Sequence, residues 1–288
     1  PALREVSMTV RAGEFVTLCG LSGSGKSTLL RQLKTALAPS GVRSGDILFD
    51  GRALSEFSQR AQAARIGFVQ QSPENQLVTD KVWHELAFGL ESLGCDTPAI
   101  RRRVAEMAGF FGMEDWFHRD VASLSGGQKQ LLNLAAVLTM QPDVLILDEP
   151  TAQLDPIAAA DFLAALARVN RELGTTVLLS EQRLEEALPL SDHAVVLNGG
   201  RVIADGVPRA VGEQLLASGN EMFRAMPAAM RIWAAAEREG QPCPVSVREG
   251  RDWFRNFAAS HGLKQVPERR APASMGETAV TVSDAWFK

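Results

Sequence analysis

The sequence VTLCGLSGSGKSTLL, residues 16–30, is the most informative pattern in this chain. It is typical of an apolar β-strand, a glycine-rich turn and the first turns of a helix. Gly20, four further residues and then Gly25-Lys26-Ser27 match the phosphate-binding P-loop pattern. Glycines let such a turn bend until successive N–H groups point into one concavity, and the positive end of the following helix attracts an anion. The alternative is a turn that binds nothing, but the strand and the helix lie where a phosphate site requires them.

The side chains of this turn predict its contacts with a nucleotide. Lys26 is expected to reach the β- and γ-phosphates, and the Ser27 hydroxyl to ligate Mg²⁺. Cys19, on the strand that enters the turn, is expected to be part of the core. The full set of expected nucleotide-binding residues is Gly20, Ser22, Gly23, Gly25, Lys26, Ser27 and Thr28.

The composition limits the classes of protein to consider. The 288 residues leave room for one large domain and a smaller one. No apolar run approaches the roughly 18 residues of a membrane span, so any membrane role is expected to depend on a partner. A formal net charge of −4 provides no electrostatic footprint for nucleic acid. The three cysteines are scattered without metal-ligand spacing, which is typical of a reducing cytoplasm.

The residues around the turn predict further short elements. Residues 1–12 carry mainly alternating apolar side chains and predict a strand. A helix is expected over 26–37, where leucines recur at helical spacing. A short strand within 44–51 is expected to end in an Asp50-Gly51 turn, and 66–69 predicts another strand.

The middle of the chain predicts helices followed by a buried strand. Residues 80–120 have helical apolar patterns, and the segment Leu124-Ser125-Gly126-Gly127-Gln128 precedes another helix, for which Ser125 could be simply the cap. Residues 144–147 are entirely apolar and end in Asp148-Glu149. A strand that is apolar on both faces is typical of the centre of a parallel sheet, whose ligands bind at the carboxyl ends of the strands.

The remaining patterns complete the expected order of elements. They predict a helix that begins at Asp155-Pro156, a strand over 175–180, a hairpin over 195–204, helices within 207–262, a linker over 264–277 and a strand over 278–287.

The P-loop, the strand that ends in Asp-Glu and the Leu-Ser-Gly-Gly-Gln segment together resemble the ATP-binding-cassette (ABC) ATPases over residues 1–206. A P-loop alone would also admit kinases and GTPases, but the Ser-Gly-Gly-Gln segment argues against both. The resemblance implies an α/β P-loop NTPase fold with a mixed sheet, a helical signature subdomain and a small C-terminal helical extension. It also implies ATP and Mg²⁺ as cofactors.

The resemblance assigns roles to residues outside the P-loop. Asp148 would bind Mg²⁺ through water, and Glu149 would polarise the attacking water. Gln71 would ligate Mg²⁺ and sense a transport partner. Asp155 would cross a dimer interface, although it could be only the cap of the helix that follows.

The resemblance also implies that a second cassette, fused or homologous, completes the site. Ser125, Gly126, Gly127 and Gln128 would bind the γ-phosphate held by the partner's P-loop, because a helix N-terminus with glycines permits the close approach of an anion. Two cassettes would therefore close head to tail around ATP.

Within the family, three segments resemble the energy-coupling-factor importers for vitamins and transition metals. These are Gln-Ser-Pro-Glu-Asn-Gln-Leu at 71–77, Glu-Leu-Ala-Phe-Gly-Leu at 85–90 and Glu-Gln-Arg-Leu-Glu-Glu at 181–186, and the helical tail over 207–262 adds to the likeness. The resemblance implies an ATPase at the cytoplasmic face of the membrane. Its partners would be a transmembrane coupling protein and a small substrate-binding membrane subunit.

The chain departs from the family pattern at two places. It contains no Tyr, so the strand that normally carries the adenine-stacking aromatic residue is expected to be missing. The family His after Glu181 is replaced by Gln182, which becomes the expected catalytic partner of Glu149. This replacement favours an alternative function, a nucleotide-binding gating module with little turnover. A cassette that acts on DNA or ribosomes is a second alternative, disfavoured by the acidic charge.

The expected domains are a cassette over 1–206, a helical extension over 207–263, and over 264–288 a linker with the first strand of a following cassette. The chain is thus expected to be the first half of a tandem ATPase.

Overall fold

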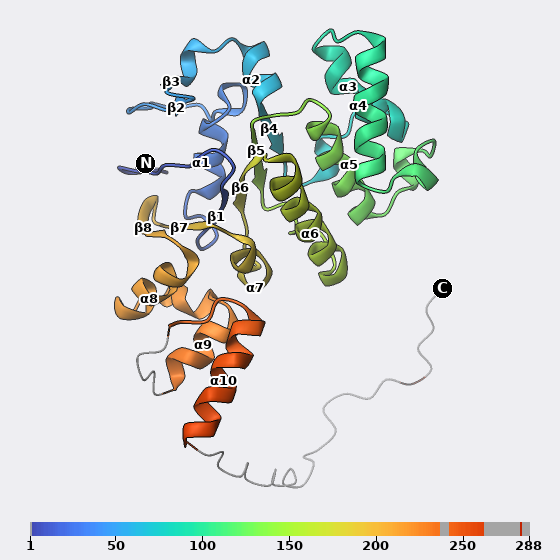
Figure 1. Cartoon of the computed structure of the whole chain (residues 1–288). Coiled ribbons are helices and arrows are strands. Elements are labelled where there is room, and N and C mark those ends of the chain that lie inside the picture. Colours follow the sequence, from blue (N-terminus) through green and yellow to red (C-terminus); the bar gives the residue numbers. More distant parts are fainter. Residues whose placement is uncertain (1, 237–241, 262–282, 284–288) are drawn as a thin grey trace.

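A six-stranded sheet forms the centre of the computed structural model, which describes residues 2–236, 242–261 and 283 (Figure 1). The strand order is β4-β5-β6-β1-β7-β8, and all neighbours are parallel except β7 and β8. The strands are β1 (Phe15–Cys19), β4 (Ile66–Val69), β5 (Val144–Asp148), β6 (Thr176–Ser180), β7 (His193–Asn198) and β8 (Arg201–Gly206).

Alternate residues of the central strands build two apolar layers, one on each face of the sheet. On β5, Leu145 and Leu147 belong to the layer beneath α5 (Gly126–Leu138) and α6 (Pro156–Leu173), whereas Ile146 faces α1 (Lys26–Gln32). These three side chains are almost fully buried. The expected mixed sheet of an α/β fold is confirmed.

The expected strand over 1–12 is wrong. Residues 2–12 form no strand, although several of their apolar side chains pack partly buried against the α1 layer. Glu5 has a φ of 51°, which interrupts an extended conformation. The Arg4 N–H donates to the Gly200 carbonyl at 2.7 Å, a single bond rather than a ladder.

Two further expectations are confirmed only in part. The helix after the P-loop ends at Gln32 and is followed by a 3₁₀ turn, Thr35–Leu37. The strand expected within 44–51 is reduced to β2 (Leu48–Phe49), which pairs with β3 (Arg52–Ala53). Asp50 and Gly51 join the two with φ values of 54° and 74°, as a two-residue hairpin of type I′ requires.

A helical unit lies beyond the β4 edge of the sheet, at the upper right of Figure 1. It contains α3 (Val82–Ser92) and α4 (Thr97–Phe110), which pack on α5 around a separate apolar cluster. Asp96 caps α4 by accepting from the Ala99 N–H at 2.8 Å. α2 (Gln59–Arg65) leads directly into β4.

The C-terminal helices lie at the opposite edge of the sheet, below β7 and β8 in Figure 1. They are α8 (Pro208–Ala217), α9 (Ala228–Ala235) and α10 (Val247–His261), and α7 (Leu184–Ala187) packs with them. In the described part of the chain, no helix has the length and hydropathy needed to cross a bilayer. The expected linker over 264–277 and, apart from Ser283, the expected strand over 278–287 lie outside the described residues.

Two glycine substitutions test how tightly the sheet packs. A Cβ on Gly67, in β4, would lie 2.5 Å from Val137 Cγ1 of α5, and the branched valine has little freedom to move. We expect Gly67→Ala to lower the free energy of unfolding by about 1–3 kcal/mol. The matched change Gly109→Ala, on the exposed surface of α4, should raise it by about 0.5 kcal/mol. Urea unfolding followed by circular dichroism measures both, and equal effects would contradict the packing of β4 on α5.

Candidate functional site

The P-loop is a tight arch between β1 and α1. Gly20, Gly23 and Gly25 have φ values of 153°, 77° and 107°, which L side chains rarely adopt. A Cβ on Gly20 would lie 2.4 Å from the Leu197 carbonyl oxygen, so the arch also needs glycine for space. Ser22 and Gly23 are exposed at the top of the arch, and Thr28 is half-buried in the first turn of α1.

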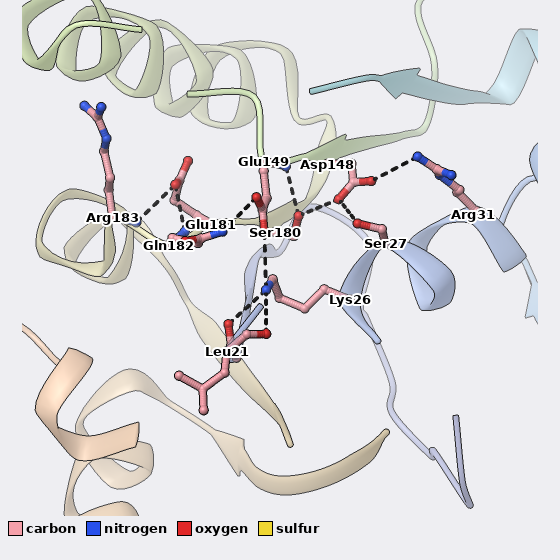
Figure 2. A network of polar contacts seen from close by, with 11 residues as sticks. Leu21, Lys26, Ser27, Arg31, Asp148, Glu149, Ser180, Glu181, Gln182 and Arg183 are labelled. Atoms are coloured by element: carbon pink, nitrogen blue, oxygen red, sulfur yellow. Dashed lines mark hydrogen bonds and ion pairs between the residues drawn. The ribbon is translucent and has the colours of Figure 1, made fainter. Parts of the chain in front are cut away.

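Lys26 is buried beneath the arch, and its ammonium group has three acceptors. Its Nζ donates to the Gly20 carbonyl at 2.9 Å and to the Leu21 carbonyl at 3.2 Å. The third partner is Glu149, whose Oε1 lies 3.3 Å from Nζ (Figure 2). An incoming phosphate would therefore compete with Glu149 for the lysine.

Asp148 lies at the end of β5 and is held from two sides. Ser27 Oγ donates to Asp148 Oδ1 at 2.8 Å, and Ser180 Oγ donates to the same oxygen at 3.0 Å. The second oxygen, Oδ2, lies 3.9 Å from the Arg31 guanidinium. Asp148 is therefore a buried carboxylate that joins the P-loop helix to the central strands.

Glu149 has a φ of 47°, which costs a non-glycine residue on the order of 1–3 kcal/mol. Its N–H donates to Ser180 Oγ at 2.9 Å and to the Ser180 carbonyl at 3.1 Å, so the neighbouring strand holds this backbone. Its side chain turns toward Lys26 on one side, while Gln182 Nε2 donates to Oε2 at 2.8 Å on the other (Figure 2). Gln182, the residue in the place of the family His, therefore contacts Glu149 directly.

A third carboxylate, Glu181, shapes the turn that carries Gln182. Its Oε1 accepts from the N–H groups of Gln182 and Arg183 at 2.7 and 3.1 Å, and its Oε2 accepts from Thr151 Oγ1 at 2.6 Å. Arg183 in turn donates to the Leu154 carbonyl. We did not expect Ser180, Glu181 or Arg183 to contribute, although Ser180 could have been found because it ends the strand beside Asp148.

The other expected site residues lie outside this network. Gln71 is exposed, two residues beyond β4, and its side chain makes no hydrogen bond with another described residue. Ser125 and Gln128 form a capping box at the start of α5, where Ser125 Oγ accepts from the Gln128 N–H and Gln128 Oε1 from the Ser125 N–H. Gly126 and Gly127 occupy the first turn of α5.

Asp155 caps α6 by accepting from the Ile157 and Ala158 N–H groups at 2.9 and 3.0 Å. A Cβ on Gly127 would lie 3.1 Å from the Ala158 Cβ, so the starts of α5 and α6 touch.

Comparison with protein families identifies the family of the chain that carries this site. The model of the ABC transporter family matches residues 3–152, which include the P-loop, the Ser-Gly-Gly-Gln segment and Asp148-Glu149. This chain belongs to the ABC transporter family. It is a cassette of the ATP-binding ATPase class.

Two curated relatives and two solved structures refine this result. An ABC transporter ATP-binding protein of Bacillus cereus is 48% identical over 259 residues, which are 90% of this chain and 46% of the relative. The energy-coupling factor transporter ATP-binding protein EcfA1 of Symbiobacterium thermophilum is 41% identical over 250 residues, 85% of this chain and 84% of the relative. The cassette spans about half the length of several curated relatives, including that of Bacillus cereus.

The structure of cbiO1 from Clostridium perfringens, described as part of the ABC transporter complex cbiONQ, has a TM-score of 0.67 at 34% identity and covers 76% of this chain and 88% of that one. A dimer of the ATP-binding cassette MJ0796 with ADP and Pi has a TM-score of 0.63 at 25% identity, with coverage of 72% and 91%. EcfA1 and cbiO1 support the assignment of this cassette to the energy-coupling-factor type.

The donor set of the cassette fits a nucleotide with Mg²⁺. Hydroxyl and carboxylate oxygens are the ligands that Mg²⁺ prefers, and Ser27 and Asp148 already lie within a hydrogen bond of each other. The exposed glycine of the arch leaves open space above it, since a Cβ on Gly23 would meet no atom within 4 Å.

Cysteine labelling tests the burial of the strand that enters the P-loop. Burial raises the pKa of the Cys19 thiol to about 12, so almost no reactive thiolate is present at pH 8. We expect iodoacetamide at pH 8 to modify the half-buried Cys95 in the folded cassette and to leave Cys19 unmodified. Peptide mass spectrometry measures both, with labelling in urea as the control. Rapid labelling of Cys19 in the folded protein would contradict its place in the core.

Proposed function

We propose that this cassette is the ATP-binding and ATP-hydrolysing subunit of an energy-coupling-factor-type importer that takes up a vitamin or a metal ion. One observation carries the proposal: Ser27 and Lys26 of the P-loop contact Asp148 and Glu149, respectively, at the end of β5. These contacts join the phosphate-binding groups to two carboxylates with different surroundings.

The two carboxylates have separate roles in this proposal. Asp148, fixed by Ser27 and Ser180, would hold Mg²⁺ together with Ser27 and Gln71; the ion neutralises phosphate charge when it is bound. Glu149, which has an amide donor on one oxygen, would polarise the attacking water once Lys26 turns to the phosphates.

A second cassette completes the site in this proposal. Ser125, Gly126, Gly127 and Gln128 form a helix start at which the first two residues are exposed and the last two half-buried, with glycines where an anion must approach closely. Asp155 lies at the neighbouring helix start. The Bacillus relatives are about twice as long as the stretch that matches, which supports a tandem arrangement with two cassettes in one protein.

The proposal of membrane partners rests on the relatives rather than on the site. The name of EcfA1 and the description of cbiO1 as part of an ABC transporter complex support a transmembrane coupling protein and a substrate-binding membrane subunit. The cassette would then lie peripherally, at the cytoplasmic face of the membrane.

A gating module with little turnover is the second candidate function, and Gln182 is the observation that favours it. Its amide donates to Glu149, but unlike histidine it carries no charge and exchanges no proton near neutral pH.

Two substitutions separate binding from hydrolysis. Lys26→Ala should abolish ATP binding in calorimetry, because the described part of the arch offers no other ammonium group to the phosphates. Glu149→Gln should keep the affinity within about threefold but lower the ATPase rate at least about a hundredfold. Glu172→Gln, an exposed change on α6, is the control and should alter neither. Undiminished affinity in Lys26→Ala, or unchanged hydrolysis in Glu149→Gln, would refute the proposed site.

Gln182→His tests whether the two ATP sites of the proposed tandem pair differ. The site that contains Lys26 and Gln182 should be slow, by about 10²–10³ if one positioned donor is impaired. The opposite site would use the Ser125–Gln128 segment of this cassette and could hydrolyse at its own rate. In the full-length protein, Gln182→His should therefore raise the total ATPase rate, whereas Ser125→Arg should suppress it. An unchanged rate in Gln182→His with the site occupied would show that the glutamine is an adequate substitute and that the pair is not asymmetric for this reason.

A further inference from the structure

The backbone at the junction between β4 and the loop over residues 70–76 is held by side-chain amides rather than by a neighbouring strand. β4 is the edge strand of the sheet, so only one of its sides pairs with β5. On the other side, the Phe68 carbonyl accepts from Gln76 Nε2 at 2.8 Å and the Gln70 N–H donates to Gln76 Oε1 at 2.8 Å. The backbone N–H and C=O groups of residues two apart on a strand point to the same edge of that strand. The carboxamide of Gln76 therefore occupies the outer edge of β4 as a short piece of strand would.

The bonds from α5 to Gln70 and Gln76 are longer. Gln130 Nε2 donates to the Gln70 carbonyl at 3.4 Å, and Asn133 Nδ2 donates to Gln76 Oε1 at 3.3 Å. A third contact from α5, the 2.8 Å ion pair between Lys129 and Glu74, joins two side chains and does not involve the backbone of Gln70. Gln130 is fully buried, yet its Oε1 has no partner in the described part of the chain. A buried amide that uses only one weak donor contributes little stability. The short bonds of Gln76, rather than α5, therefore fix the backbone of Gln70.

Gln71 is the residue that follows Gln70, whose backbone is held in this way. The register of β4 on β5 pairs Val69 with Leu147, so Gln71 and Glu149 each follow their paired residue by two positions. The direction in which the chain leaves Gln70 thus decides whether the Gln71 side chain can reach the end of β5.

We infer that Gln76 is a positioning residue for the nucleotide site: its carboxamide aims Gln71 at the Mg²⁺ and phosphate groups bound at Ser27 and Asp148. The inference rests on the proposed function. It predicts that Gln76 contributes to the part of nucleotide affinity that depends on Mg²⁺ and not to the part that the P-loop supplies alone.

The test measures nucleotide binding in the full-length protein. Isothermal titration with adenylyl imidodiphosphate, a non-hydrolysable ATP analogue, gives the affinity in Mg²⁺ and in EDTA. Gln76→Leu should lose about tenfold of the affinity gained from Mg²⁺, equivalent to about 1.4 kcal/mol, and change the EDTA affinity less than about twofold. Asn75→Leu is the matched control, because Asn75 is the exposed amide next to Gln76, and it should change neither value.

Hydrogen exchange reports the positioning itself. The Gln70 amide should exchange at least about tenfold faster in Gln76→Leu than in the native protein, because its acceptor is gone. Gln76→Glu provides a variant of the same shape. It keeps an acceptor for the Gln70 N–H but turns an oxygen toward the Phe68 carbonyl. It should therefore also lower the affinity gained from Mg²⁺. This variant replaces Gln76→Leu in the test if the leucine variant does not fold. Asn133→Leu should lower the gain less than about threefold, since both short bonds remain.

Each outcome decides between the two claims. If both Gln76 variants bind the analogue as the native protein does and gain the same affinity from Mg²⁺, this inference is wrong and the proposed function stands. An equal loss in Asn133→Leu overturns the assignment of the role to Gln76 rather than to α5. Failure of the native protein to bind the analogue overturns the proposed function, and the inference with it.

Discussion

The hydrogen bond between Ser27 and Asp148 is the contact on which the site depends. The two residues are 121 positions apart, and neither strand that leads to them is adjacent to the other: β6 lies between β1 and β5. The bond forms because parallel strands end at the same edge of a sheet. Ser180, at the end of the intervening β6, donates to Asp148 and accepts from the Glu149 N–H, so it lies between the ends of the two strands that flank β6. Any loss of register among the three strands would separate the P-loop from its carboxylates.

The same edge explains which parts of the site can be read from the sequence. The P-loop glycines and Asp148-Glu149 are local patterns, since each is a strand followed by a turn with a fixed composition. Their contact follows from parallel topology alone. Glu181 is different: its carboxylate binds the backbone of its own turn and the Thr151 hydroxyl, which is 30 residues away. A contact of this kind depends on how two loops face each other, and no spacing in the sequence encodes it.

The wrong prediction of a strand over residues 1–12 has a similar cause. The alternation of residues 1–12 is real, because Leu3, Val6, Met8 and Val10 do pack partly buried. An apolar alternation records which side chains face the core, whereas a strand also needs a partner with free backbone groups. In the described part of the chain, a single backbone hydrogen bond, from the Arg4 N–H to the Gly200 carbonyl, joins this segment to the hairpin of β7 and β8. By contrast, the Asp50-Gly51 turn was predictable, since a two-residue hairpin loop requires positive φ at both positions.

The C-terminal helices are packed onto the very segment that carries Gln182. α7 begins two residues after Gln182, and its Leu184 lies in one apolar cluster with Met226 and Met230 of the C-terminal region. Glu185 Oε2 accepts from the Ala228 N–H at 2.7 Å, at the start of α9. On the other side, Glu181 and Arg183 attach the same segment to the loop after β5. The turn between these attachments is therefore short and held at both ends, which restricts where the Gln182 amide can point. Its bond to Glu149 results from this restriction as much as from the attraction between the two side chains, because the amide of a free loop would have to lose far more conformational entropy to make it.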